Sequence, residues 1–150
     1  MTLQSMFGLK DSYKESTYRE SVTTFKFIAE LMEALANRNK KVDVLMTKSG
    51  DKFGYDVVLH CDGQSKYIQL KTTVNTKVWS NIHTSLINNP HGEIIIIYLV
   101  FSNPTKWDVK YRPLDKSKLT IDNTKQRQKI DKSMLHKQMN VFALSKYLFP

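Results

Sequence analysis

Residues 55–71 read YDVVLHCDGQSKYIQLK. Two runs of alternating apolar residues flank Asp62-Gly63, and Asp-Gly between such runs is a strong signal for a β-hairpin. If the turn has two residues, counting back along both strands places Asp56 opposite Gln69. The stretch therefore predicts a hairpin that brings together side chains thirteen positions apart in the sequence.

One face of this hairpin is polar. Side chains alternate along a strand, so Gln69 and Lys71 share a face, and Asp56 would lie about 5 Å from Gln69 between Cβ atoms. Carboxylate and amide oxygens suit a divalent cation, and a lysine can act on the attacking water or on a developing phosphorane. A metal would polarise the phosphoryl oxygen and lower the pKa of bound water. The patch therefore suits phosphodiester hydrolysis; the alternative is a face that merely meets water.

The same residues resemble a nuclease motif. Residues 53–56 (FGYD) followed by residues 68–73 (IQLKTT) are similar to the PD-(D/E)xK core in its variant with Gln for the second acid. Closer still, they resemble the group I intron-encoded homing endonucleases built on that core. The resemblance covers about residues 15–101. It departs at Tyr55, where the motif has Pro, and at Gln69, which brings no charge.

The resemblance implies an α/β fold with a restriction-endonuclease-like core, a mixed central β-sheet flanked by helices. It also implies a sequence-specific double-strand DNA endonuclease with Mg2+ as cofactor, Mn2+ as a substitute, and Ca2+ binding without supporting cleavage. Asp56 and Gln69 would hold the metal, and Lys71 would be catalytic. Since Gln69 is neutral, metal binding should be weaker and should depend on another carboxylate or on the DNA phosphate.

Nucleases of this class usually add a glutamate from the first helix. The candidates here are Glu20, Glu30 and Glu33. Glu30 and Glu33 lie opposite the main apolar stripe of the predicted helix, which favours simple solvation. Glu20 lies on the side of a second stripe, where a carboxylate costs free energy unless it is paired or binds a metal. We therefore expect Glu20 to be the third metal ligand.

Size and charge limit the possibilities. With 150 residues the chain is expected to form a single domain, residues 1–150, with a substantial core. Its 23 basic and 14 acidic residues give a net charge of +9, which favours polyanionic partners. The lone Cys61 excludes an internal disulfide and fits a reducing compartment. Since no apolar run is long enough to span a membrane and the N-terminus lacks a signal-peptide core, we expect a cytoplasmic protein.

The expected elements run helix, three strands, helix, strand. The first helix covers residues 15–37, with a possible capping box from Ser12 to Glu15. A strand at residues 41–46, the hairpin, a helix at residues 78–87 and a buried strand at residues 93–101 follow. The first helix carries a main apolar stripe and a narrower second stripe of Phe27, Leu31 and Ala34, which predicts contacts on two sides of the helix; the main stripe comprises Phe25, Ile28, Ala29, Met32, Leu35 and Ala36.

Residues 102–150 are expected to be an elaboration for DNA binding and oligomerisation. Residues 106–112 alternate like a strand, and residues 123–149 have mostly helical character. Trp79 and Trp107 are expected to be core or interface residues rather than base-stacking platforms.

Basic residues gather in the C-terminal half. Residues 106–132 hold nine Lys or Arg and four Asp, an excess of five positive charges. Guanidinium groups bind bases and phosphates bidentately, and a basic strand can enter the major groove. The alternative is that these lysines only maintain solubility. The candidate DNA contacts are Lys48, Lys52, Lys77, Lys106, Lys110, Arg112 and Arg127.

Cleavage of both strands of a duplex requires two active sites, so we expect a homo-oligomer, a dimer at minimum and a tetramer if the recognition site is long. An apolar C-terminal set could be the interface or could dock on the chain's own core: Val141, Phe142, Leu144, Tyr147, Leu148 and Phe149. Two other functions stay open: a junction-resolvase-like or restriction-type nuclease, and an inactive DNA-binding module, which the neutral Gln69 favours.

Overall fold

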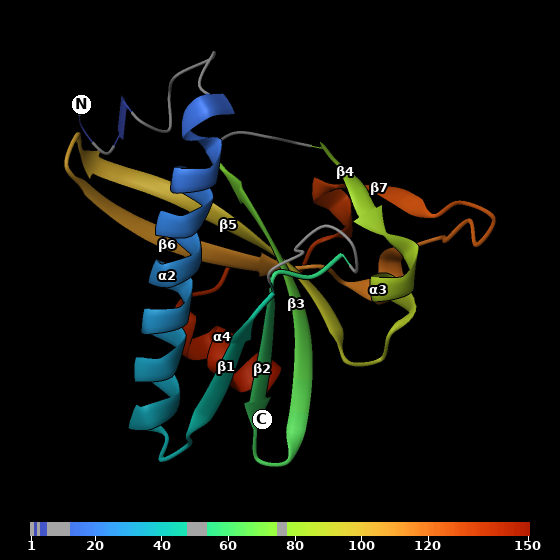
Figure 1. Cartoon of the computed structure of the whole chain (residues 1–150), viewed down its shortest axis with the longest axis horizontal. Helices are drawn as coiled ribbons and strands as arrows, with labels where there is room; N and C mark the ends of the chain where they lie inside the picture. Colours follow the sequence, from blue (N-terminus) through green and yellow to red (C-terminus); the bar gives the residue numbers. More distant parts are fainter. Residues whose placement is uncertain (1, 3, 6–12, 48–53, 75–77) are drawn as a thin grey trace.

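The chain folds around a mixed five-stranded β-sheet in a computed structural model that describes residues 2, 4–5, 13–47, 54–74 and 78–150, without the side chains of 13–17 (Figure 1). The strand order is β1-β2-β3-β5-β6; β3 and β5 are parallel, and the other neighbours are antiparallel. The expected α/β architecture with a mixed central sheet is therefore confirmed. The strands are β1 (Val42–Met46), β2 (Val57–Cys61), β3 (Gln64–Thr73), β5 (Gly92–Asn103) and β6 (Lys106–Pro113).

Different elements cover the two faces of the sheet (Figure 1). On one face lie the long helix α2 (Tyr13–Asn37) and the short C-terminal helix α4 (Val141–Leu148). On the other lie α3 (Thr84–Asn88) and a two-stranded sheet of β4 (Val78–His83) and β7 (Arg127–Asp131). Two 3-10 turns, η1 (Lys116–Lys118) and η2 (Lys132–Met134), complete the chain. Among the described residues, no helix has the length and apolar character to cross a membrane.

The β2–β3 hairpin has the predicted register. Cys61 pairs with Gln64 across a two-residue turn in which Asp62 and Gly63 have φ values of 53° and 76°. Positive φ at both positions marks the type I′ turn, whose twist matches that of the flanking strands. The register continues along the ladder to Val57 opposite Ile68. Asp56 therefore enters the hairpin one step before that pair, beside Gln69.

Strand β5 is buried on both faces, as the unbroken apolar run predicted. Ile95 and Ile97 pack in the core under α2 and α4, while Ile94 and Ile96 pack under α3 and the β4–β7 sheet. All four are at most 1% exposed. A central strand that is covered on both faces has a continuous run of apolar residues in its sequence rather than an alternating pattern.

Helix α2 faces the sheet with its second stripe and with Leu35 of the main stripe, while most of the main stripe points away from the sheet. Phe27 and Leu31 are buried, whereas Phe25 and Met32 are 59% and 45% exposed. The ring of Phe27 meets Tyr111 of β6 edge to face, with centroids 5.8 Å apart. These contacts turn the wider stripe away from the sheet. The predicted capping box at Ser12 and Glu15 lies outside the described side chains.

A buried hydrogen bond joins α2 to β6. The hydroxyl of Tyr111, which is fully buried, donates to Glu30 Oε2 at 2.7 Å. Lys26 lies 3.3 Å from the other oxygen of Glu30 and 5.2 Å from the ring centroid of Trp107. Burial and the Glu30 carboxylate raise the pKa of Tyr111, so its hydroxyl stays protonated and donates. Glu30 was expected to be solvated, and the structure instead makes it half-buried and paired.

Two helix predictions in the C-terminal half were wrong for most of their length, although each range contains one short helix, and the second helix begins after the break predicted near Asn140. Residues 78–87 form strand β4 followed by the short α3, and residues 123–149 contain β7, η2 and α4. β4 and β7 pair with each other, with Trp79 opposite Ile130 and both buried. Pairing between segments about fifty positions apart overrides local helical character, because each strand satisfies the backbone groups of the other. Strand β6 was predicted correctly, and its Trp107 packs against the core.

The apolar C-terminal set packs on the chain's own core. Asn140 caps α4 by accepting a hydrogen bond from the N–H of Ala143 at 2.9 Å. Leu148 and Phe149 are at most 2% exposed in the core under α2. Of the two roles considered for this set, docking is therefore the one that the structure shows, and only Phe142 is largely exposed, at 45%.

Replacing Tyr111 with Phe should lower the free energy of unfolding by about 1–2 kcal/mol, because the half-buried Glu30 carboxylate loses a charge-assisted hydrogen bond. Urea denaturation measures this. Tyr98→Phe is the matched control, since the buried Tyr98 hydroxyl has no hydrogen-bond partner within the described structure. Equal losses in the two variants would contradict the role assigned to Tyr111.

Candidate active site

Asp56 lies where the chain enters the hairpin, held by backbone hydrogen bonds on two sides. Its N–H donates to the carbonyl of Ile68 at 2.7 Å, and its carbonyl accepts from the N–H of Thr47 at 3.1 Å. The side-chain Oδ2 accepts from the N–H of Leu70 at 2.8 Å. The carboxylate is therefore fixed against the β3 backbone at Leu70, the residue between Gln69 and Lys71 in the sequence.

The side chain of Gln69 is buried and carries an unsatisfied oxygen. It is 4% exposed, and its Oε1 has no hydrogen-bond partner within the described structure. Leaving a buried polar oxygen unpaired costs about 1–3 kcal/mol, so such a group in a folded protein calls for an explanation. A hard cation is one, because amide and carboxylate oxygens are the donors that Mg2+ accepts, and Mg2+ keeps several waters and needs only one or two carboxylates.

Lys71 shares the sheet face of Gln69. Ile68 packs in the core under α2, and the hydroxyl of Thr72 donates to Thr23 of α2 at 3.2 Å, so these two residues face that helix. Strand alternation then directs Gln69 and Lys71 to the opposite face. Lys71 is half-buried near the C-terminal end of β3. The register thus places Asp56, Gln69 and Lys71 at neighbouring positions of one sheet face, and the convergence of their side-chain groups on one ion stays a prediction.

Glu20 is exposed on α2, one turn before the contact between Thr23 and Thr72. Its backbone carbonyl accepts from the Thr23 hydroxyl at 3.0 Å. Among the described residues, no group of three or more His, Cys, Asp or Glu side chains is arranged to hold a metal ion. The acidic donor set near β3 therefore rests on Asp56, and the ligand role of Glu20 stays a prediction.

The described basic candidates on β6 lie on the same side of the sheet as Lys71. Across the sheet, Lys71 pairs with Ile96, which pairs with Arg112; one row further, Tyr98 pairs with Lys110. Lys106 is exposed at the start of β6, and Arg127 is exposed at the start of β7. Lys48, Lys52 and Lys77 lie outside the described residues.

Arg112 has a structural task that the sequence did not reveal. Its Nε donates to the carbonyl of His136 at 2.7 Å, and its guanidinium carbon lies 6.0 Å from the Tyr98 ring centroid. These contacts tie β6 to the segment after η2. Lys110 lies 3.6 Å from Asp108 and is otherwise accessible. Of the two, Lys110 has the freer charge for a phosphate.

Sequence reasoning missed the packing of His83 against Gly54, two positions before Asp56. Gly54 has a φ of 79°, and a Cβ atom there would lie 2.6 Å from Cβ and Cγ of the buried His83. Next to it, Tyr55 meets Tyr67 edge to face at 5.1 Å between centroids. A glycine two positions before the key carboxylate was the available signal, since close backbone approach requires one.

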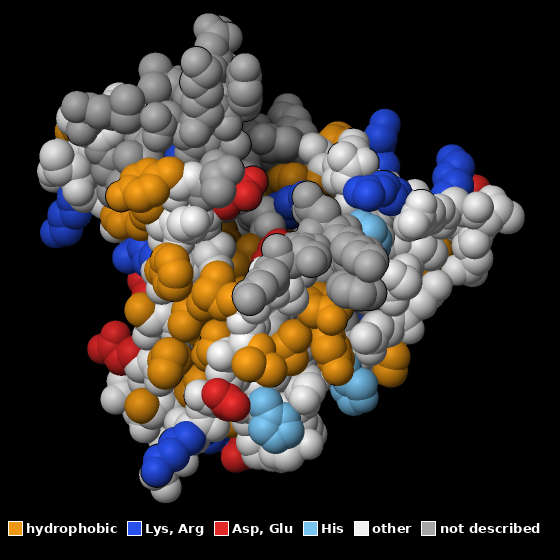
Figure 2. All heavy atoms as spheres, viewed as in Figure 1, with side chains coloured by type: hydrophobic (Ala, Val, Ile, Leu, Met, Phe, Trp, Pro, Cys, Tyr) orange, Lys and Arg blue, Asp and Glu red, His pale blue; other side chains and the backbone are white. Residues whose placement is uncertain are grey.

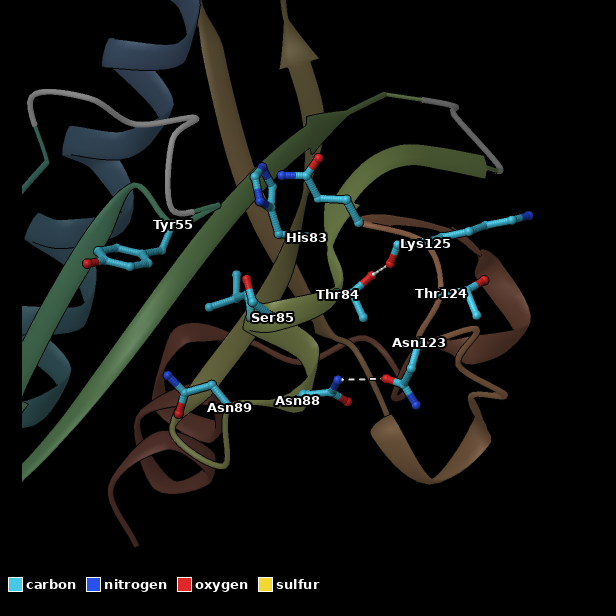
Figure 3. Close-up of a pocket in the computed structure, with 11 residues that line it drawn as sticks. Tyr55, His83, Thr84, Ser85, Asn88, Asn89, Asn123, Thr124 and Lys125 are labelled. Carbon is cyan, nitrogen blue, oxygen red and sulfur yellow. Dashed lines mark hydrogen bonds between the residues drawn. The ribbon is translucent and has the colours of Figure 1, made fainter.

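A pocket of about 690 Å3 opens beside Tyr55, between α3 and residues 123–126 (Figure 3). Many of its polar groups pair with one another: Asn88 donates to Asn123 at 2.9 Å, and the Thr84 hydroxyl donates to the Lys125 carbonyl at 2.6 Å. These hydrogen bonds connect the turn before β7 to α3, along the pocket that Tyr55 also lines.

Comparison of the chain with models of known protein families, with curated proteins and with solved structures found no match.

Gly54→Ala should lower the free energy of unfolding by about 2–4 kcal/mol, because the methyl group meets His83 and the residue must keep a left-handed backbone. Thermal or urea denaturation tests this. Gly63→Ala is the control: its φ is 76°, but nothing lies within 4 Å of an added Cβ, so about 1 kcal/mol is expected. Equal effects would rule out the close approach.

Proposed function

We propose that the chain is a divalent-metal-dependent, sequence-specific DNA endonuclease of the homing type. The observation that carries the proposal is the buried Oε1 of Gln69, which has no hydrogen-bond partner within the described structure, at a position beside Asp56 in the hairpin register and on the face of Lys71. A face that merely meets water would not bury its amide. Two oxygen donors and an ammonium group together form the minimum set for phosphodiester hydrolysis.

The residues have distinct roles in this proposal. Asp56, fixed by the Leu70 N–H, and Gln69 would hold Mg2+, with Glu20 as the proposed third ligand. The metal would polarise the phosphoryl oxygen and lower the pKa of bound water. Lys71 would orient that water or stabilise negative charge on the phosphorane. The single carboxylate at the strand ends makes the DNA phosphate itself a needed ligand, as is common for Mg2+.

The sheet fits the proposed restriction-endonuclease-like core. Helix α2 precedes the three strands β1, β2 and β3, and the parallel neighbour β5 follows a crossover. Lys106 and Lys110 lie on β6 on the side of the sheet shared with Lys71, and the exposed Arg127 begins β7 in the layer that covers part of that side, which supports DNA contacting this exposed rim. The net charge of +9 supports a polyanionic substrate. A buried lone Cys61 fits the proposed cytoplasmic location.

A catalytically inactive DNA-binding module is the second candidate. The neutral Gln69 and the absence of an acidic cluster among the described residues favour it. The same basic face would then bind DNA without hydrolysis. A junction-resolvase-like or restriction-type nuclease would share the core and differ in its substrate.

Cleavage distinguishes these functions. Purified protein should nick or cut plasmid DNA that carries candidate sites in Mg2+ or Mn2+, and should not cut with Ca2+ or chelator. Asp56→Asn and Lys71→Ala should each abolish cleavage while DNA binding persists in a gel-shift assay. Gln64→Leu, an exposed change on the same strand, is the control. Tight binding without cleavage would favour the inactive module, and preferential cutting of branched DNA would favour a resolvase.

Gln69→Leu should separate stability from activity. Leucine has a similar volume and removes the orphan oxygen, so the free energy of unfolding should stay equal or rise by up to about 2 kcal/mol. Cleavage should be lost, because a metal donor is gone. If the variant is less stable and still cuts, the amide is structural and the proposed site is wrong.

DNA affinity should fall steeply with salt, because each phosphate contact releases counterions. Fluorescence anisotropy at several salt concentrations gives the slope. Lys110→Ala should reduce this slope by about one. Lys41→Ala removes an exposed lysine directly before the edge strand β1 and should change the slope little. An affinity that is flat in salt would contradict a basic DNA-binding face.

A further inference from the structure

We propose that the outward face of α2 binds the same helix of a second copy of this chain, in antiparallel orientation. Six residues, which we call the α2 stripe, follow one another at alternating spacings of four and three. This 3.5-residue period is the pattern of helices that pack along a shared seam. The α2 stripe comprises Tyr18, Val22, Phe25, Ala29, Met32 and Ala36.

The α2 stripe is exposed although the opposite side of the helix is buried. Tyr18, Phe25 and Met32 are 57%, 59% and 45% exposed, whereas Phe27 and Leu31 are at most 1% exposed. Figure 2 shows hydrophobic side chains gathered along this helix on the face turned to the viewer. The helix thus carries one apolar face for its own sheet and another that the described chain does not cover. A contiguous exposed apolar face of this kind marks an interaction site.

The order of side-chain sizes fits a second copy. When two identical helices pair antiparallel about residue 27, positions equally far from that residue face each other. Phe25 then meets Ala29 of the other copy, Tyr18 meets Ala36, and the remaining layer pairs Met32 with Val22. Every layer joins a larger and a smaller side chain, which is the condition for close packing. Parallel pairing would instead set Phe25 against Phe25 and leave the alanine layers underfilled.

Charge beside the α2 stripe favours the same orientation. Arg19 and Glu33 are fourteen positions apart, two full repeats, so both lie on one flank of the seam. Antiparallel pairing brings Arg19 of one copy towards Glu33 of the other, whereas parallel pairing would place these flanks on opposite sides of the seam. An isologous two-fold interface is the commonest way for a soluble chain to assemble.

If two copies pair in this way, they supply the two active sites that double-strand cleavage requires. This consequence rests on the proposed function. The interface differs from the one expected from the sequence, because the C-terminal set is used inside the chain. The oligomer itself is inferred from α2 alone, so it can be tested without DNA.

Sedimentation velocity or light scattering of the full chain without DNA should give a dimer or a larger even-numbered oligomer. Phe25→Glu should weaken self-association about a hundredfold or more, since two such residues enter each interface. Phe142→Glu is the matched control: the same change at an exposed phenylalanine on α4 should leave the assembly intact. Met32→Glu, with circular dichroism to verify folding, provides a second variant. A monomeric wild type, or equal behaviour of Phe25→Glu and Phe142→Glu, overturns the proposal.

Cysteine crosslinking tests the orientation. A mixture of Phe25→Cys and Ala29→Cys chains should form disulfides more readily than either variant alone; the native Cys61 is 1% exposed and does not compete. Faster crosslinking of Phe25→Cys with itself would indicate parallel helices and refute the antiparallel model. If the wild type is dimeric and Phe25→Glu is monomeric yet neither cuts DNA, the interface stands and the nuclease proposal falls.

Discussion

The register of the β2–β3 hairpin is the constraint on which the site depends. The turn at Asp62-Gly63 sets it, because positive φ at both residues suits the twist of the strands. A slip of one residue would send Gln69 and Lys71 to the face covered by α2 and would remove Asp56 from their side. The buried residues Val57 and Ile68 resist such a slip, since it would expose them.

Local signals predicted the parts of the fold that are local. The Asp-Gly turn, the alternation of β6 and the isoleucine run of β5 each carried their own evidence and were confirmed. The pairing of β4 with β7 could not be predicted, because neither segment has a strong period and each is a strand only beside the other. For the site, the sequence supplied Asp56, Gln69 and Lys71 but not the burial of the Gln69 amide, which depends on what packs over that face.

Helix α2 shows why hydrophobic periodicity alone does not orient a helix. It carries two apolar stripes, and most of the wider one points outward, although Leu35 of that stripe is buried in the core. Two hydrogen bonds set the orientation of the helix: Tyr111 donates to Glu30, and Thr72 donates to Thr23. The narrower stripe, which includes Phe27, therefore faces the sheet. A stripe that seems redundant for the fold then becomes a feature that evolution can use for assembly.

The neutral amide at position 69 also affects how the chain can fold. A carboxylate buried in that place beside Asp56 would repel it, so the folded state would have to take up a proton or wait for an ion. The glutamine imposes only the milder cost of an unpaired dipole. Under the proposed function, the chain would therefore complete its fold before any cation binds, and a newly made copy would not compete for magnesium in order to fold.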